Sequence, residues 1–353
     1  MDKILTLIIP SYNMEKYLDR CLSSLIVDEE HMMMFEALII NDGSTDRTSE
    51  IGHQYEERCP ESFRVIDKEN GHYGSCVNRG LSEARGVFIK ILDADDSLDS
   101  QEFSLFLDFI NNTNVESNAD LILSNYSFVR ENNSFVKSYF FSHYDCPCSL
   151  KSISEKDRMD WFIHGLTYKT QLLKEIHYHQ TEGISYTDNE WIFNPLIKVR
   201  SIYQFKGTLY RYTIDREGQS MSTEQRIKNL SMSFQVIESN VSFYHDNVID
   251  DAGVSSFMVD RLIKEASHLY QLCLFTYNCT VDSLEKLKQF DRFLSEKNSI
   301  VYDSTGRYSI TIGGIRFYPV SDWRGHNYKI KVAQILYRLA DWFHKVYNRT
   351  STK

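Results

Sequence analysis

The chain has 353 residues, more than one ordinary hydrophobic core contains, which predicts a large domain with a further unit attached. With 42% hydrophobic and 25% charged residues its composition is that of a globular protein, and a net charge of −10 disfavours a broad nucleic-acid-binding surface, so no nucleic-acid partner is expected. The seven cysteines are too scattered for a zinc site or a disulfide framework, and we expect reduced thiols.

The first hundred residues alternate between predicted strands and predicted helices. Short β-branched apolar runs, typical of strands buried on both faces of a parallel sheet, occupy residues 4–9, 35–40, 63–66 and 87–92. Helical spacing of apolar residues is found at 15–26, 48–58 and 76–84. This alternation predicts a mostly parallel α/β sheet, in which ligands bind beyond the carboxyl ends of the strands.

The rest of the sequence is predicted to become increasingly helical. Up to about residue 220 it mixes helices at 101–111, 154–164 and 187–199 with strands at 120–128 and 201–211 and a hairpin within 131–148. Beyond that point the predicted elements are helices, at 226–244, 254–277 and 282–296. We therefore expect a domain boundary near residue 220, with 1–220 as an α/β domain and 221–353 as a helical region.

Polar loops follow three of the predicted strands. They are Ser11-Tyr12-Asn13, Asp42-Gly43-Ser44 and Asp93-Ala94-Asp95-Asp96. Because the carboxyl ends of parallel strands meet at one edge of a sheet, we expect the three loops to form a single ligand site. A Gly-rich segment from Asn70 to Ser75 could also bring backbone N–H groups to a phosphate, although it is neither a Walker A loop nor a dinucleotide fingerprint.

The three carboxylates of the last loop repel one another unless a cation neutralises them. Mg²⁺ and Mn²⁺ prefer hard oxygen ligands and usually take one or two carboxylates together with phosphate oxygens. Asp93 and Asp95 therefore suit a metal-bridged diphosphate. The alternative is an acidic turn in which Asp96 caps the helix that begins near Gln101 or caps a preceding turn.

Two further carboxylates have both a chemical and a structural interpretation. Asp42 could accept the imide N–H of uracil, with Gly43 letting the backbone approach the ligand, but a plain Asx turn would explain the same residues. Asp188 could be the single base that deprotonates the acceptor hydroxyl in a sugar transfer by direct displacement. It could instead be an acidic residue in the first turn of a helix, where the helix dipole favours it, and the residues alone do not single it out.

Taken in this order, the segments Ile8 to Asn13, Ile39 to Asp46 and Leu92 to Asp96 resemble the family 2 inverting glycosyltransferases of the bacterial surface-glycan type. The resemblance covers about the first hundred residues well and extends more weakly to about residue 222. It implies a GT-A fold, in which 1–100 form the nucleotide-binding half and 101–220 the acceptor half. The region 221–353 then remains as a helical C-terminal extension.

The resemblance also implies roles for individual residues. It implies donor contacts from Pro10, Tyr12, Asn13, Asp42, Ser44, Asn70, Asp93, Ala94 and Asp95. Asp95, together with Asp93, would ligate a divalent metal, Mn²⁺ or Mg²⁺, and Asp188 would be the catalytic base. His164 and Trp191 belong to the acceptor half and would line the acceptor site, although His164 could equally be a structural histidine with its hydrogen bonds satisfied.

The implied activity is transfer of a hexose or N-acetylhexosamine from a nucleotide sugar to a glycan, glycoprotein or lipid-linked oligosaccharide, with inversion at the anomeric carbon. We favour a UDP-sugar donor, because a carboxylate at Asp42 pairs with the uracil imide. The sequence has no Gln-x-x-Arg-Trp motif, which argues against a processive polysaccharide synthase. Two alternatives remain. One is a nucleotidyltransferase acting on sugar phosphates, and the other is an inactive module that binds nucleotide sugars.

The sequence departs from the family pattern in two places. Thr187 stands where the family has the first acid of the Glu-Asp pair that supplies the base. Cys76-Val77-Asn78 stands where the family often has Ala-Arg-Asn, so the phosphate contact of that arginine would have to come from another cation. The candidates for this contact are Arg79, Lys90 and Arg211.

The segment 328–349 is basic within an acidic protein and has apolar residues along one helical face. This composition is typical of a helix that lies in a membrane interface, and equally of one that packs on the protein or in a homodimer. The sequence shows no signal peptide, and no apolar run approaches the roughly 20 residues that cross a bilayer. We therefore expect a cytoplasmic protein, with peripheral contact at the inner face of the cell membrane as one outcome.

Overall fold

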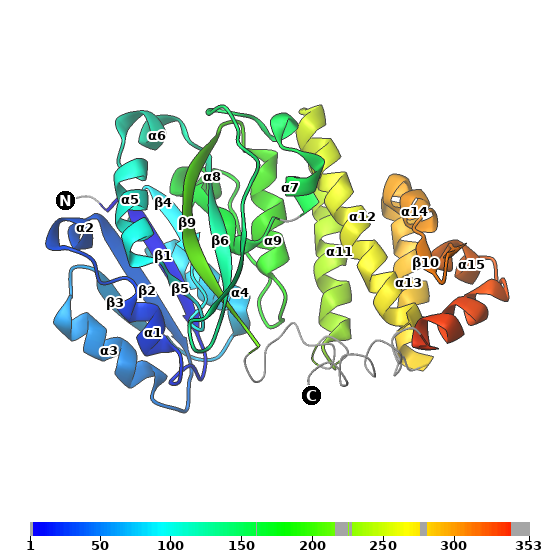
Figure 1. Ribbon diagram of the computed structural model, residues 1–353, viewed down its shortest axis with the longest axis horizontal. Helices are drawn as coiled ribbons and strands as arrows, with labels where there is room; N and C mark the ends of the chain where they lie inside the picture. The colour runs from blue at the N-terminus through cyan, green and yellow to red at the C-terminus, as the bar shows by residue number, and fades with distance from the viewer. Residues whose placement is uncertain (1–2, 160, 216–224, 226–227, 276–280, 340–353) are drawn as a thin grey trace. The chain divides into compact units, whose positions relative to one another are not determined.

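The computed structural model describes residues 3–159, 161–215, 225, 228–275 and 281–339 (Figure 1). The chain divides into two compact units, Met1–Gln219 and Ser220–Lys353, and each is described by itself.

The first unit is built on a nine-stranded sheet. Its strands are β1 (Leu5–Ser11), β2 (Phe35–Asp42), β3 (Phe63–Lys68), β4 (Phe88–Ile91), β5 (Ser97–Leu98), β6 (Leu121–Arg130), β7 (Phe135–Tyr139), β8 (Leu166–Lys169) and β9 (Ile202–Ile214). They are ordered β3-β2-β1-β4-β8-β6-β9-β5, with β7 paired to β6. The pairs among β3, β2, β1 and β4 are parallel, as the sequence predicts.

The second half of this sheet is mixed. β8 runs antiparallel to both β4 and β6, whereas β6 and β9 are parallel. The short β5 follows the acidic loop and pairs antiparallel with β9, so that Leu98 lies opposite Tyr210. This pairing brings the far end of β9 to the acidic loop.

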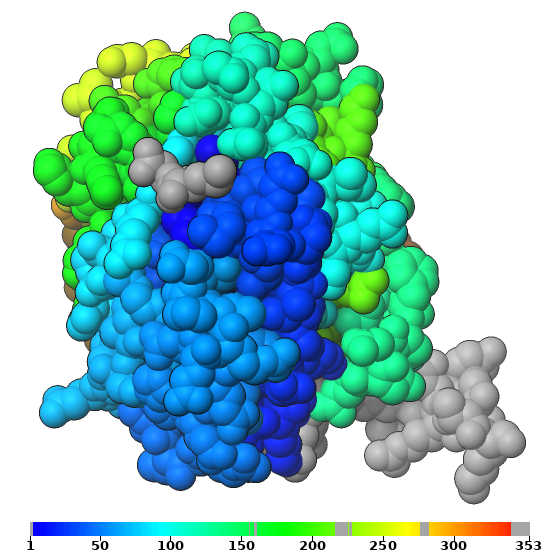
Figure 2. Space-filling model, turned by 90° about the vertical axis from the view of Figure 1, so that its left-hand side faces the viewer, coloured from blue at the N-terminus to red at the C-terminus, as the bar shows by residue number. Residues whose placement is uncertain are grey.

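Helices flank the sheet. They are α1 (Leu18–Ser23), α2 (Glu29–Met34), α3 (Thr48–Arg58), α4 (His72–Glu83), α5 (Ser100–Ile110), α6 (Thr113–Asn118), α7 (Glu155–Met159), α8 (Thr170–Glu175) and α9 (Asp188–Phe193), with 3-10 turns at Leu150–Ser152, Ile163–Gly165 and Asn194–Ile197. β1 and β2 are buried along their whole length, which explains their nearly continuous apolar sequence. Figure 2 shows residues 3–100, coloured blue to cyan, as one continuous surface.

Three predicted helices of this unit differ from the observed ones. The segment 15–26 contains only α1, and 154–164 contains only α7 before its 3-10 turn. The segment 187–199 forms α9 followed by a 3-10 turn with Pro195 near its start, because proline has no N–H for an α-helical hydrogen bond. The predicted cap of the helix near Gln101 is also wrong: the carboxylate of Asp99, not Asp96, accepts from the N–H groups of Gln101 and Glu102.

Helix α4 lies close against β1. A Cβ atom added to Gly80 would come within 2.6 Å of the Ile8 side chain, so this approach requires a glycine. The contact fixes α4 under the sheet and places its N-terminal turn, which contains Tyr73, beside the loops that follow the parallel strands.

The second unit is mainly helical, which confirms the predicted helical C-terminal region. Its elements are α11 (Leu230–Asp246), α12 (Ala252–Phe275), α13 (Val281–Lys297), α14 (Ser299–Gly306), β10 (Ile310–Ile312), β11 (Ile315–Phe317) and α15 (Pro319–Arg324). Residues 329–339 are also helical. The β10–β11 hairpin was not predicted.

The core of this second unit is aromatic. The rings of Phe234 and Phe290 lie 5.4 Å apart, and Arg324 stacks on the Tyr302 ring while pairing with Asp291 at 2.7 Å. Within the described parts of the chain, no helix is both long enough and apolar enough to span a bilayer.

Candidate functional site

The loops after β1 and β2 hold each other in place. Ser11 pairs with Asn41 at the ends of the two parallel strands. Beyond this pair the N–H of Asn13 donates to the Ser44 hydroxyl at 3.0 Å, and the Thr45 N–H donates to the Asn13 side-chain oxygen at 2.9 Å. Asn13 adopts a positive φ of 54°, which asparagine tolerates better than most residues. Asn13 and Ser44 are both predicted to contact the sugar donor. In the structure these two residues also hold the two loops together by hydrogen bonds.

Asp42 connects this pair of loops to the Gly-rich segment. The carboxylate is 2% exposed, and its Oδ1 accepts from the Lys68 ammonium at 2.6 Å and from the Gly71 N–H at 2.9 Å. The Asn70 side chain donates to the Asp42 carbonyl at 2.9 Å. Asp42, which is predicted to contact the nucleotide base, thus lies beside Asn70 and the Gly-rich segment. Its ion-pair partner Lys68 was not predicted from the sequence.

The aromatic and apolar members of the predicted site differ in exposure. Tyr12 is 48% exposed at the end of β1, where its ring is free to stack on a planar ligand. Pro10 and Ala94 are buried. Their role is therefore to shape the backbone of the two loops.

In the acidic loop, Asp96 is tied to β9. Its side chain is fully buried, and it accepts from the Tyr210 hydroxyl and from the Thr213 N–H, both at 2.7 Å. Burial, followed by repulsion from Asp95 and Asp93, raises the pKa of Asp96 well above its usual range. The Tyr210 hydroxyl also accepts from the Asp93 N–H at 3.2 Å, so one phenol supports both ends of the loop.

Three groups of this cluster could hold a divalent cation. Asp93, Asp96 and His164 each place a ligand atom within 4.8 Å of the others. Burial and the neighbouring Lys90 lower the pKa of His164 to about 3, so its ring is neutral, as a metal ligand must be. Its Nδ1 atom is buried and has no hydrogen-bond partner among the described residues.

These residues fit a metal, and Asp96 and His164 are candidate ligands in addition to the predicted Asp93 and Asp95. Asp95 lies next to this group and is 8% exposed. His164 was predicted to face the acceptor, and its ring lies 4.6 Å from Tyr210 and 4.5 Å from Tyr212. No local sequence signal connects residue 164 to the acidic loop, because only the pairing of β8 with β4 and β6 brings them together.

The three cations proposed for the phosphate contact are engaged elsewhere. Arg79 pairs with Glu83 at 3.0 Å, and Arg211 pairs with Asp99. Lys90 is fully buried and donates to the carbonyl oxygens of His164 at 2.6 Å and Leu166 at 3.4 Å. Lys90 is thus a support beneath the His164 backbone.

Lys90 should make the free energy of unfolding depend on pH in the neutral to alkaline range. Burial lowers its pKa from 10.5 to about 7, so between these values the unfolded chain binds a proton that the folded chain does not. The unfolding free energy of the wild type relative to Lys90→Met should therefore rise with pH across this window, by up to about 1.4 kcal/mol per pH unit. Urea unfolding at about pH 7.5 and about pH 9.5 measures the difference. The exposed Lys198→Met is the control, and an equally flat difference for both variants would contradict the assignment.

Tyr73 interacts with the acidic loop and also feels the charge of the predicted base, Asp188. The Tyr73 hydroxyl donates to Asp93 Oδ1 at 2.8 Å. Its pKa is raised well above the usual range by burial, then by Asp93, then by Asp188, so both carboxylates act on the same phenol. Asp188 is the first residue of α9, and Thr187, in place of the family's acid, is buried and accepts from Gln180 at 2.9 Å.

Trp191 has a different position from the predicted one. It is fully buried, with its ring between Tyr168 and Tyr178 at centroid distances of 5.3 and 5.4 Å. We therefore assign Trp191 to the core that supports α9 and not to the acceptor site.

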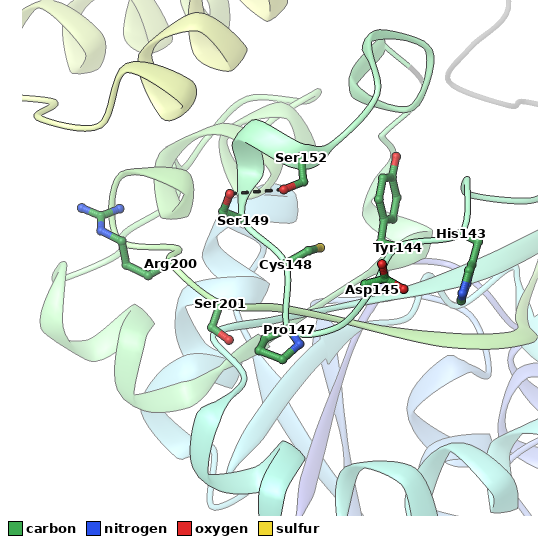
Figure 3. A pocket seen from close by; sticks show the side chains of 9 residues that line it. All are labelled: His143, Tyr144, Asp145, Pro147, Cys148, Ser149, Ser152, Arg200 and Ser201. Atoms are coloured by element: carbon green, nitrogen blue, oxygen red, sulfur yellow. Dashed lines mark hydrogen bonds between the residues drawn. The ribbon is translucent and has the colours of Figure 1, made fainter.

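An open hollow of about 750 Å³ lies elsewhere in this unit (Figure 3). It is lined by residues around Cys148 and by Arg200 and Ser201, next to the start of β9. The acidic loop contacts β9 near Tyr210, roughly 25 Å further along the strand at about 3.3 Å per residue. This hollow is therefore separate from the candidate site.

Comparison with known proteins gives a family match for the segment that carries the site. Residues 6–163 match the model described as Glycosyl transferase family 2. The chain is 28% identical over 188 residues to "Glycosyltransferase GlyA" of Streptococcus pneumoniae, covering 50% of this chain and 26% of that protein. It is 35% identical over 103 residues to "Uncharacterized glycosyltransferase EpsJ" of Bacillus subtilis, covering 29% of each. The chain thus spans less than a third of the length of these two relatives.

The fold is similar to that of a solved structure. Residues 1–349 of TarS from Staphylococcus aureus, in complex with UDP-GlcNAc, have a TM-score of 0.60 at 18% identity, covering 89% of this chain and 95% of that chain. At this identity the similarity concerns the fold. It confirms the predicted fold class, a mixed α/β sheet domain with a helical C-terminal region.

Proposed function

We propose that this chain, whose residues 6–163 match the model for family 2 glycosyltransferases and which has a GT-A fold, transfers a hexose or N-acetylhexosamine from a UDP-sugar to a surface glycan or a lipid-linked oligosaccharide. The observation that supports this most is the convergence of Asp42, the acidic loop and Asp188 around the Gly-rich segment. Two relatives are named for polyol-phosphate polymers: "Teichoic acid poly(glycerol phosphate) polymerase" of Staphylococcus epidermidis and "Poly(ribitol-phosphate) beta-N-acetylglucosaminyltransferase TarS" of Staphylococcus aureus. These names favour a polymer of this kind as the surface glycan that accepts the sugar.

The base and ribose would be held at the ends of β1 and β2. Tyr12 offers an exposed ring for stacking, and Asp42 offers Oδ2 to an N–H group because Oδ1 already accepts from Lys68 and Gly71. Such an arrangement selects a base edge that donates a hydrogen bond, as the uracil imide does.

A divalent cation would be held by Asp93 with Asp95, or with Asp96 and His164. When bound, it neutralises the charge that develops on the departing diphosphate. Asp93 belongs to both sets, and its carboxylate is oriented by the Tyr73 hydroxyl.

Asp188 would accept the proton of the acceptor hydroxyl as that oxygen attacks the anomeric carbon. A single base and a single displacement give inversion of configuration. Tyr73, which lies near both Asp93 and Asp188, links the donor side of the site to this base. We place this reaction in the cytoplasm, where nucleotide sugars are available.

The donor assignment can be tested through Asp42. Lys68 and Gly71 hold an oxygen at the Oδ1 position, so in Asp42→Asn the amide nitrogen should take the Oδ2 position and oppose the uracil imide. The variant should bind UDP at least about tenfold more weakly and should gain affinity for CDP, whose ring nitrogen accepts a hydrogen bond.

The measurement is calorimetric titration of UDP, CDP and GDP with Mn²⁺ present. Asp108→Asn, which makes the same change on the exposed face of α5, is the control and should keep the wild-type order. A wild type that prefers GDP or CDP would refute the UDP assignment but not the glycosyltransferase activity.

A further inference from the structure

The C-terminal part of the chain has a small excess of positive charge. The chain has a net charge of −10, yet residues 220–353 have 17 Lys or Arg and only 14 Asp or Glu. The imbalance is concentrated near the end, where the segment 307–339 contains six Lys or Arg and a single Asp. The second unit therefore presents positive charge in an otherwise acidic protein.

The helix at residues 329–339 has one face packed on the protein. Ala333 is fully buried, and the Gln334 side chain donates to the Leu274 carbonyl at the end of α12 at 2.6 Å. The Tyr337 ring lies 5.0 Å from that of Phe275. Because these contacts come from one side of the helix, its opposite side faces away from α12.

That opposite side has an exposed apolar stripe. It consists of Tyr328, Val332, Ile335 and Leu339, which are 72, 41, 58 and 49% exposed. At about 100° per residue the four positions fall within an arc of roughly 60°, diametrically opposite Tyr337. Partial exposure of four large apolar side chains on one stripe is unfavourable in water unless a partner covers it.

Positive charges flank this stripe on both sides. Lys329 lies on one flank, and Lys331 and Arg338 lie on the other, all exposed. Neither Lys329 nor Lys331 has a carboxylate partner within 4 Å in the part of the chain that the structure describes. The sequence continues the same apolar spacing with Trp342, Phe343 and Val346, which lie outside the described residues.

We propose that this face of the 329–339 helix binds an anionic phospholipid surface, with the apolar stripe in the interface and the flanking cations at the headgroups. Buried apolar area and attraction to anionic lipid together determine the binding of such helices. Charge decides between a membrane and a second copy of this chain. In a two-fold dimer the cationic flanks would approach each other, whereas an anionic surface is complementary to them.

The test is co-sedimentation of the full chain with vesicles, either of phosphatidylcholine alone or of equal parts phosphatidylcholine and phosphatidylglycerol. The wild type should partition to the anionic vesicles and should be released by added salt. The double variant Ile335→Gln and Leu339→Gln should partition at least about tenfold more weakly. Lys329→Glu with Lys331→Glu should lose about tenfold or more on the anionic vesicles.

Matched substitutions in the first unit serve as controls. Leu105→Gln changes a side chain that is 51% exposed on α5, and Lys151→Glu with Lys198→Glu makes the same charge change on exposed residues; both should partition like the wild type. Thermal unfolding should be unchanged in every variant, because the substituted side chains are exposed.

Equal partition of the wild type and of the glutamine double variant would overturn the proposal. So would a change from dimer to monomer in that variant, measured by sedimentation velocity, with vesicle binding retained. That second result would assign the stripe to another copy of the chain.

Discussion

Asp93→Asn is expected to reduce glycosyl transfer by about a thousandfold or more, because this carboxylate belongs to both sets of metal ligands that the site offers. Mn²⁺-dependent UDP binding should be lost with it, measured by calorimetry with and without the metal. The amide keeps an oxygen for the Tyr73 hydroxyl, so the local packing is preserved.

The effect on stability separates lost chemistry from lost folding. Asp93 contributes to raising the pKa of Asp96 by repulsion, so removing its charge removes an unfavourable interaction within the acidic loop, and the metal-free protein should keep about the wild-type melting temperature. A lowered melting temperature together with lost activity would contradict the assignment. Asp108→Asn again provides the control for the same change at an exposed position.

The same assay distinguishes the two ligand sets. Asp95→Asn should abolish metal-dependent binding if the sequence-predicted pair holds the ion. His164→Gln should do so if the cation lies among Asp93, Asp96 and His164. If transfer continues at the full rate in Asp93→Asn, neither set is the metal site.

Asp188→Asn is expected to abolish transfer while leaving the donor affinity nearly unchanged. A general base contributes typically a hundredfold to ten-thousandfold in rate, and the asparagine cannot accept the proton of the acceptor hydroxyl. Initial rates of product formation and calorimetric UDP binding should therefore respond separately, with a fall in kcat and no change in the Kd of UDP.

A neighbouring acid offers a matched comparison for this second variant. Glu190 lies on the same short helix but is buried and accepts from both the N–H and the hydroxyl of Thr181 at 2.7 Å. Glu190→Gln should lower the melting temperature, and the molecules that remain folded should transfer the sugar at the wild-type rate. Retained turnover in Asp188→Asn would show that the base lies elsewhere.

The donor side of the site could be predicted from sequence because it is local. Each loop directly follows a buried, β-branched strand, and the parallel order of β1, β2 and β4 places the loop ends together. Asp42, Asn70 and the acidic loop therefore could be placed near one another from strand ends alone. The partner of Asp42 was missed, since Lys68 is the last residue of β3 and carries no signal of its own.

The acceptor side depends on long-range pairing, which no local pattern reports. Lys90 looked available for a phosphate, but β8 crosses beside β4 and buries it under His164. Trp191 looked like a contact for a sugar, but Tyr168 of β8 and Tyr178 enclose it in the core. Asp188 could be placed through the family resemblance only, because its approach to Asp93 runs through Tyr73 on a separate helix.

The hydroxyl of Tyr210 has a consequence for how such enzymes can be recombined. It accepts a hydrogen bond from the Asp93 N–H and donates one to Asp96, so a residue of β9 completes the loop that follows β4. Consider a chimera that joins residues 1–100 of this chain to the later part of a relative. Its Asp93 N–H and Asp96 carboxylate would lose these hydrogen bonds unless the relative has a tyrosine at the equivalent position. The tyrosine at position 210 should therefore be retained in any such graft.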